Sequence, residues 1–111
     1  MPHPSLSFAM GGKTQTSIAD FRSGIQVELD TKARLGAAVC RIVERRRLTQ
    51  AEVAVALKIN QPKVSALLHY KLEGFSVERL MRFLIALGHD VEIVVKSRPS
   101  ARSARIAVRA A

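Results

Sequence analysis

Cysteine, long apolar runs and catalytic groupings are all scarce in this sequence. The single cysteine, Cys40, cannot form an internal disulfide, and no second cysteine or spaced histidine lies near it to hold a metal. The three histidines, His3, His69 and His89, fall in different segments, and no serine or cysteine has an evident base. We therefore predict that the protein is not an enzyme and needs no metal or other cofactor.

No segment approaches the roughly 18 consecutive apolar residues of a membrane span. The start of the chain, MPHPSLSFAMGGKTQ, has neither a positive leader nor a sustained apolar region. A length of 111 residues with 48% hydrophobic content suits one globular domain with tails. We expect a cytoplasmic protein that does not interact with membranes.

Acidic residues are few, because 9 Asp and Glu stand against 18 Lys and Arg, which gives a formal net charge of +9. The excess lies in the middle of the chain and in the tail, where four arginines follow one another from Arg98 without an acid. This balance favours a polyanionic partner, either nucleic acid or an anionic membrane surface. A basic surface kept only for solubility remains an alternative on charge alone.

Composition divides the chain into three parts. Residues 1–30 form a flexible or partner-binding lead, residues 31–97 a helical domain, and residues 98–111 a basic disordered tail. Four apolar residues of the lead are candidates for contact with a partner protein, although they could equally pad the protein's own helices: Ile18, Phe21, Ile25 and Val27.

Helical spacing predicts a first helix that begins near Asp30 or Thr31, either of which can cap its first turn. A second helix begins at Gln50 and runs to about Leu57. Thr49 and the glutamate three residues later form a capping box at its start. The buried side of the first helix is predicted to contain Leu35, Val39, Ile42 and Val43.

The tripeptide Asn60-Gln61-Pro62 separates the second helix from a third one, Gln61 to His69. Asn60 is a good cap, and proline is tolerated in the first turn of a helix but would cost about 3 kcal/mol in its middle. Ser76 then caps a fourth helix, and Gly88 is placed to end it. The core face of this fourth helix is predicted to contain Val77, Leu80, Met81, Leu84 and Leu87.

The segment DVEIVVK predicts a β-strand, with Val91, Ile93 and Val95 on one face. A lone strand leaves its backbone amides and carbonyls without partners. The segment GIQVEL near residue 27 is one candidate partner. The simpler solution is the same strand of a second copy, paired across a two-fold axis, so we predict a homodimer.

Two short helices joined by a turn of three or four residues describe a helix-turn-helix. Ala54 lies where the two helices approach closely. Lys58 occupies the turn position that glycine usually holds, and a non-glycine residue with positive φ there costs roughly 1 kcal/mol. The expected fold is therefore mainly α, a phage-repressor-like helical bundle with a helix-turn-helix and a C-terminal strand.

The stretch LTQAEVAVALKINQPKVSALL resembles the helix-turn-helix of the Xre/Cro family of phage-repressor-like regulators. The longer run through GFSVERLMRFLIALGHDVEIVVK resembles the HigA-type antitoxins within that family. The resemblance implies that Gln50 contacts a DNA phosphate and that the exposed start of the third helix faces base edges. The predicted DNA-binding residues are Thr49, Gln50, Asn60, Gln61, Pro62, Lys63, Ser65, His69 and Lys71.

These features predict a sequence-specific transcriptional repressor that binds double-stranded operator DNA as a dimer. The resemblance to HigA-type proteins further implies an antitoxin that autoregulates its operon and neutralises a RelE-like ribonuclease toxin, with Ile18, Phe21, Ile25 and Val27 in the contact. The alternative is a stand-alone or phage-type Xre regulator with no toxin partner.

Overall fold

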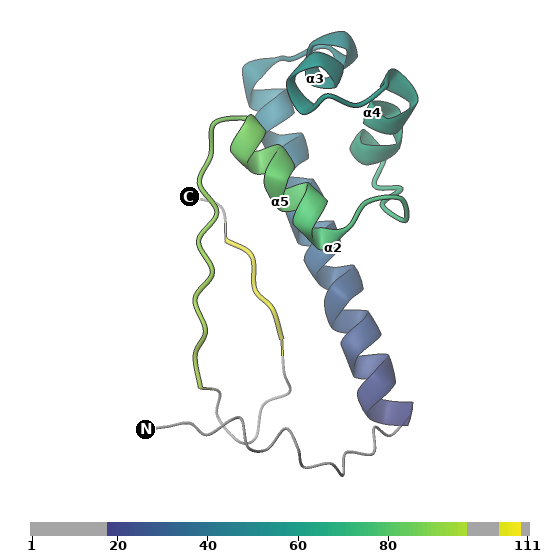
Figure 1. Cartoon of the computed structure of the whole chain (residues 1–111), viewed down its shortest axis with the longest axis vertical. Coiled ribbons are helices and arrows are strands. Elements are labelled where there is room, and N and C mark those ends of the chain that lie inside the picture. Colours follow the sequence, from purple (N-terminus) through teal and green to yellow (C-terminus); the bar gives the residue numbers. More distant parts are fainter. Residues whose placement is uncertain (1–17, 98–104, 110–111) are drawn as a thin grey trace.

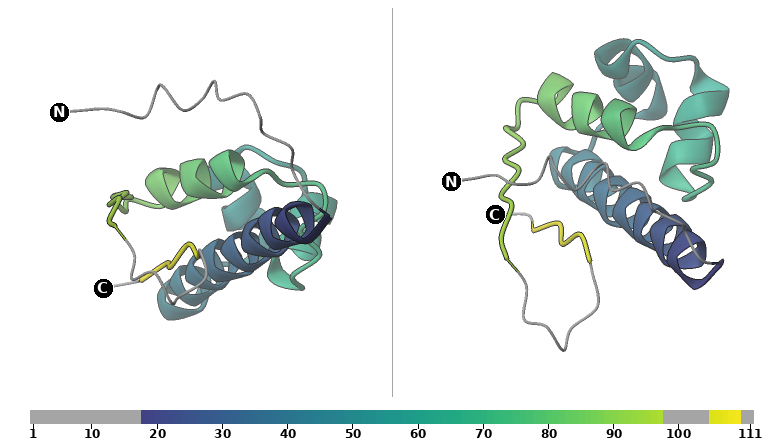
Figure 2. Two further views of the ribbon diagram at one scale, coloured as in Figure 1. Left: turned by 90° about the horizontal axis from the view of Figure 1, so that it is seen from below. Right: turned by 60° about the horizontal axis from the view of Figure 1, so that its bottom comes forward.

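The computed structural model describes residues 18–97 and 105–109, and this part of the chain contains four α-helices (Figure 1). Helix α5 lies along the long helix α2, and the pair α3 and α4 covers the C-terminal end of α2 (Figure 2). The helices are α2 (Ile18–Arg46), α3 (Gln50–Leu57), α4 (Gln61–Leu68) and α5 (Val77–Ala86).

Helix α2 begins earlier than the sequence predicted. It starts at Ile18 and continues through Asp30 and Thr31, so the prediction that one of these two residues caps its first turn was wrong. The Thr31 hydroxyl donates to the Val27 carbonyl oxygen over 2.7 Å, and the Asp30 carboxylate accepts from Gln26 over 3.0 Å. Both side chains are thus engaged within the helix, one turn earlier in the chain, and not at a free helix end.

The starts of the three shorter helices confirm the predicted caps. Thr49 and Glu52 form the capping box of α3, with side-chain to backbone hydrogen bonds in both directions. The Asn60 side chain accepts from the Lys63 amide over 2.9 Å at the start of α4. The Ser76 hydroxyl accepts in the same way from the third amide of α5. Each cap satisfies an amide that the helix itself leaves free.

The hydrophobic core lies between α2 and α5 and continues under α3 and α4. The apolar faces predicted for the first and fourth helices are buried, except that Val77 and Met81 are only partly so. Each of the four helices contributes at least one side chain with no exposed surface. The core also contains three side chains that the sequence prediction did not include: Leu72, Phe75 and Phe83. The largest fully buried side chains of the described residues are Val39, Val53, Val64, Leu67 and Leu80.

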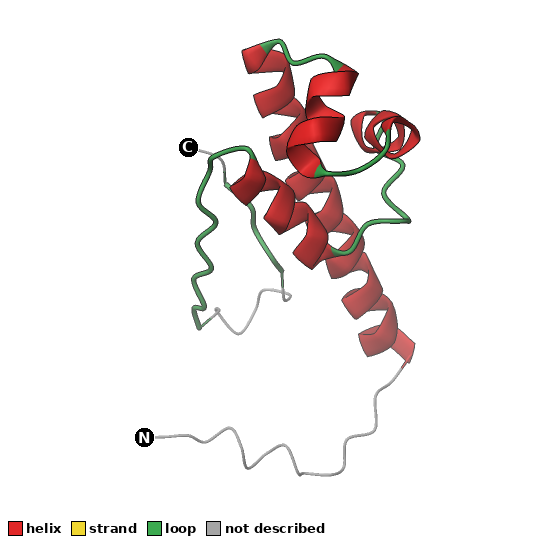
Figure 3. Ribbon diagram, turned by 45° about the horizontal axis from the view of Figure 1, so that its top comes forward, coloured by secondary structure: helices red, strands yellow, loops and turns green. Residues whose placement is uncertain are grey.

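The predicted C-terminal strand is not a strand in the single chain. Within the described residues, 89–97 run as an extended segment without sheet pairing, drawn as a loop in Figure 3. Val91 packs partly against the core, whereas Ile93 and Val95 are 71% and 91% exposed. The intramolecular partner GIQVEL is excluded, because these residues belong to helix α2. A strand needs a neighbouring edge for its amides, and this segment has none in the described chain.

Part of the predicted tail also lies in the described structure. Residues 105–109 are extended, and Val108 is half-buried against the core, while Arg105 and Arg109 are exposed. The other residues of the predicted tail, Arg98 and Arg102 among them, lie outside the described residues.

Candidate DNA-binding surface

The turn between α3 and α4 has the geometry that the helix-turn-helix pattern predicted. Lys58 adopts the left-handed conformation, with φ 58° and ψ 46°, and its amide donates to the Ala54 carbonyl oxygen. The Ile59 amide also donates to this oxygen, over 3.1 Å. Lys58 therefore occupies a backbone conformation that glycine adopts more readily. Positive φ costs free energy in a residue with a Cβ, so this turn is strained.

The start of α4 presents polar side chains to solvent. Gln61 and Pro62 are exposed in its first turn, because the Asn60 cap ends the preceding turn and fixes where the helix begins. Gln50 is exposed at the first position of α3, directly after the Thr49 cap. The start of α3 therefore combines uncapped backbone amides with the neutral Gln50 side chain, which suits a phosphate. At the start of α4, Pro62 has no amide and Asn60 accepts from the Lys63 amide, so the neutral Gln61 side chain is the hydrogen-bonding group available for a base edge.

The predicted residues at the other end of α4 are placed differently. Ser65 is half-buried, and its carbonyl oxygen lies 2.8 Å from Nδ1 of the exposed His69 ring. When Nδ1 carries the ring proton, it donates to the Ser65 carbonyl oxygen within α4 and is not available to contact DNA. Lys71 follows as an exposed side chain, and Tyr70 between them has a φ of 60°.

Lys63 does not simply extend into solvent. Its Nζ lies 5.5 Å from the centroid of the buried Phe75 ring, and the Arg79 guanidinium carbon lies 5.6 Å from the same centroid. Sequence reasoning missed both Phe75 and Arg79. Their spacing in the sequence could have predicted the contact, because Arg79 lies four residues after Phe75 and four before Phe83. The Arg79 guanidinium carbon also lies 5.7 Å from the centroid of the Phe83 ring.

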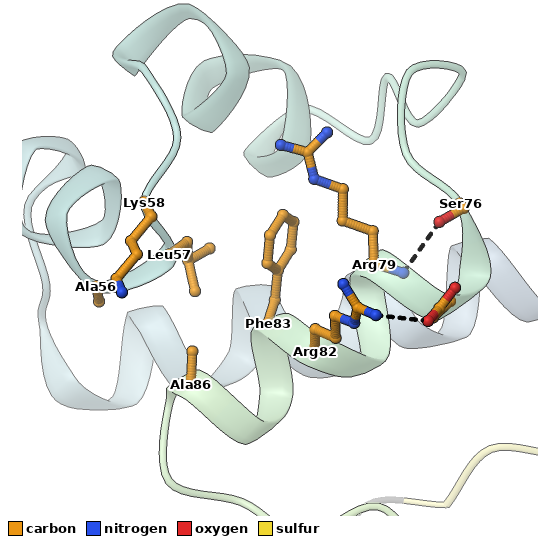
Figure 4. A pocket seen from close by; sticks show the side chains of 9 residues that line it. Ala56, Leu57, Lys58, Ser76, Arg79, Arg82, Phe83 and Ala86 are labelled. Carbon is orange, nitrogen blue, oxygen red and sulfur yellow. Dashed lines mark hydrogen bonds and ion pairs between the residues drawn. The ribbon is translucent and has the colours of Figure 1, made fainter.

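A shallow cleft of about 460 Å³ opens between α3 and α5, beside this cluster (Figure 4). Its rim carries Lys58, Arg79 and Arg82, and Leu57 and Phe83 lie between them. Arg82 is held by Glu78 over 2.7 Å on the same helix. The three cations outnumber the one acid at the rim, so the cleft suits an anion better than an apolar ligand.

Cys40 is buried in the core, with its Sγ 3.8 Å from the Leu67 carbonyl oxygen. Burial raises the pKa of the Cys40 thiol above its ordinary value, and partial burial likewise raises the pKa of Tyr70, which faces it. A thiol with a raised pKa is a poor nucleophile at neutral pH. We therefore interpret Cys40 as a structural residue of the core and not as a reactive thiol.

The described residues contain neither a metal-binding cluster nor a membrane-spanning helix. No cluster of three or more His, Cys, Asp and Glu that could hold a metal ion is found among them. None of the helices in this part of the chain is long and apolar enough to cross a membrane.

The predicted partner-binding residues fall on α2. Ile25 is 44% exposed and Val27 is half-buried, while the side chains of Ile18 and Phe21 lie outside the described residues. Leu29, which the sequence prediction did not include, is 53% exposed one turn after Ile25. Ile25 and Leu29 thus form an exposed apolar pair on the N-terminal half of α2.

Comparisons with known proteins agree with this geometry. A family model described as a helix-turn-helix domain matches residues 17–96. A solved structure named as an XRE-family transcriptional regulator is 57% identical, with a TM-score of 0.73, and the match covers 78% of this chain and 98% of that one. No curated protein matches the chain.

Proposed function

This chain belongs to the Xre-type helix-turn-helix regulators, which bind DNA and regulate transcription, and we propose that it represses its own promoter as a homodimer in the cytoplasm. The observation that carries the proposal is the exposed start of α4. Its cap, its proline and its outward Gln61 present a helix end that fits the major groove, with the half-buried Lys63 in the same turn.

Within this proposal, the residues of the surface have separate roles. Gln61 reads a base edge, since an amide side chain can pair bidentately with adenine. Gln50, the free amides of α3 and Lys71 contact phosphates and fix the register of the protein on the duplex. Lys63 contacts either a guanine edge or a flanking phosphate. Thr49 and Asn60 act through the caps that hold the two helix starts in place.

A binding measurement tests the proposal. Fluorescence anisotropy compares a duplex from the region upstream of the gene with a scrambled duplex of the same composition. For a sequence-specific repressor, we expect the upstream duplex to bind at least about 10³-fold more tightly than the scrambled duplex at physiological salt. Equal affinity for the two duplexes would sink the proposal, because non-specific charge attraction would then explain all of the binding.

Dimerisation is proposed through the extended segment 89–97. Ile93, Val94 and Val95 are all exposed, at 71%, 63% and 91%, and the segment has no sheet partner in the described chain. Pairing with the same segment of a second copy satisfies the backbone and brings Ile93 and Val95 of the two copies side by side on one face. Two recognition helices would then lie about 34 Å apart, one turn of DNA.

Light scattering on the purified chain tests this interface. Replacement of Ile93 and Val95 by lysine is expected to give monomers with weaker operator binding. A single Val94→Lys change, on the opposite face of the segment, serves as the control and is expected to remain dimeric. A dimer that survives the double substitution would contradict pairing through this segment.

We also propose the antitoxin role, with a RelE-like toxin as the partner. The support is the exposed pair Ile25 and Leu29 on α2, which the chain itself leaves uncovered in the described structure. The alternative is a stand-alone regulator, for which these side chains are ordinary surface residues.

Co-purification with the product of the neighbouring gene separates the two. Replacement of Ile25 and Leu29 by aspartate is expected to abolish the complex, while Val55→Asp, at an apolar position of α3 that is 78% exposed, leaves it intact. Unchanged binding by the α2 variant would refute this contact. A neighbouring product that never binds the wild-type chain would favour the stand-alone regulator.

A further inference from the structure

Three elements meet at the ring of Phe75. Lys63 comes from the first turn of α4, Phe75 from the loop after α4, and Arg79 from the first turn of α5. Both cations lie within 5.6 Å of the ring centroid, inside the range in which an aromatic face attracts a positive charge. Phe75 itself is 2% exposed and packs edge-on against Phe83, with centroids 5.7 Å apart. The ring is therefore a fixed support.

Two positive charges on one ring repel each other. Lys63 Nζ and the Arg79 guanidinium carbon can be no farther apart than the sum of their two distances to the ring centroid. This upper limit is close to the Debye length of about 10 Å at 0.1 M salt, so salt screens the repulsion only in part. The described residues contain two ion pairs, Lys32–Glu28 and Arg82–Glu78, and neither one includes these cations. The acid of the first turn of α5 thus neutralises Arg82 and not Arg79. An anion placed between the two cations would remove the repulsion.

We propose that Lys63, Phe75 and Arg79 form a clamp that binds one backbone phosphate of the DNA. The Arg79 side chain extends away from α5 toward α4 (Figure 4). Lys63 and the exposed Gln61 both belong to the first turn of α4, so the clamp stands at the same end of this helix as the base-reading side chain. This inference deepens the proposed DNA-binding function and rests on it.

Phe75 is the positioning residue of the clamp. Long basic side chains lose rotamer freedom when they bind a ligand, and a side chain that is held beforehand loses less. The ring holds both cations in the free protein, so the loss at binding is reduced. Phe75 contacts no DNA in this scheme and acts only through Lys63 and Arg79.

Salt dependence of binding to the upstream duplex tests the clamp. Arg79→Met keeps an apolar stem over the two rings but removes the charge. Lys63 still faces the phosphate in this variant, so the slope of log affinity against log salt is expected to fall by up to about 0.9, the value for one phosphate. This upper limit corresponds to about eightfold weaker binding at 0.1 M salt. Arg82→Met is the matched control, because it makes the same charge change three residues later, at a cation that Glu78 already neutralises. Equal losses in the two variants, or no loss in Arg79→Met, would overturn the clamp.

A double-mutant cycle tests the role of the ring. Phe75→Leu keeps an apolar side chain in the core but removes the aromatic face. If the ring positions Arg79, the Arg79→Met change costs less in the Phe75→Leu background than in the wild type. A purely structural effect of Phe75 would give additive losses and would contradict the positioning role. Thermal unfolding of each variant shows that the folded state is retained.

The clamp and the proposed function fail in different ways. Preference for the upstream duplex with an unchanged slope in Arg79→Met refutes the clamp alone. Absence of preference refutes the proposed repressor. In that case the scrambled duplex still tests the clamp, because phosphate contacts govern non-specific binding, and a lowered slope there supports it.

Discussion

Replacement of Lys58 by glycine is expected to stabilise the protein. Lys58 has a φ of 58°, in the left-handed region where the Cβ of an L-residue approaches the following carbonyl oxygen. That conformation costs roughly 1–2 kcal/mol for an ordinary residue. Glycine avoids this cost but loses more backbone freedom on folding, by roughly 0.5–1 kcal/mol. The net gain is therefore about 0.5–1 kcal/mol.

Urea unfolding followed by far-UV circular dichroism measures this gain. The midpoint should rise without a change in the slope m, because the surface exposed on unfolding stays the same. A gain of this size corresponds to a rise of about 2–8 °C in Tm for a domain of this length. Lys58→Ala is the control, because it removes the same charge and keeps the strain of a Cβ. Lys58→Gly that is no more stable than Lys58→Ala would refute the argument from backbone strain.

Three other perturbations have defined outcomes. Leu67→Ala, at a side chain with 0% exposure, should lower the free energy of unfolding by about 2–5 kcal/mol in urea titrations, and a loss well below that range would contradict tight packing under α4. A Cβ at Gly74 would lie 3.8 Å from Lys63 Nζ, so the carboxylate of Gly74→Asp should pair with that cation. This variant should bind the upstream duplex up to about eightfold more weakly, whereas Gly74→Ala should bind as the wild type does. Equal affinities of the two variants would argue against a role for the lysine charge. Because burial raises the pKa of Cys40, the folded state holds the thiol proton more tightly than the unfolded state does. The contribution of this thiol to the free energy of unfolding is therefore fully present below pH 9.0 and falls as the pH rises above that value. The urea midpoint measured against pH should decline less steeply in Cys40→Ala, and an identical decline would exclude the thiol as its cause.

Local sequence signals predicted the helix-turn-helix well, because they act over a few residues. The capping box at Thr49, the Asn60 cap and the left-handed Lys58 each depend on neighbours along the chain, and each is present in the structure. The start of α2 was predicted wrongly for a related reason. Asp30 and Thr31 are equally able to cap a helix or to bond within one, and the sequence alone does not decide between the two.

Features that depend on distant residues were not predicted. The meeting of Lys63 with Phe75 and Arg79 requires α4, the following loop and α5 to be packed together, and no local pattern encodes that arrangement. The strand at 90–96 was predicted from β-branched residues, yet a strand also needs an edge to pair with. Its state in the protein therefore depends on the second copy that we propose.

Sequence-specific DNA binding is proposed for the start of α4. The most direct measurement compares wild type and Gln61→Ala on the upstream duplex and on the scrambled duplex at one salt concentration. The substitution is expected to weaken upstream binding by about 1–3 kcal/mol and to leave scrambled binding unchanged, because the side chain contacts a base edge. An equal loss on both duplexes, or no loss on either, would contradict it.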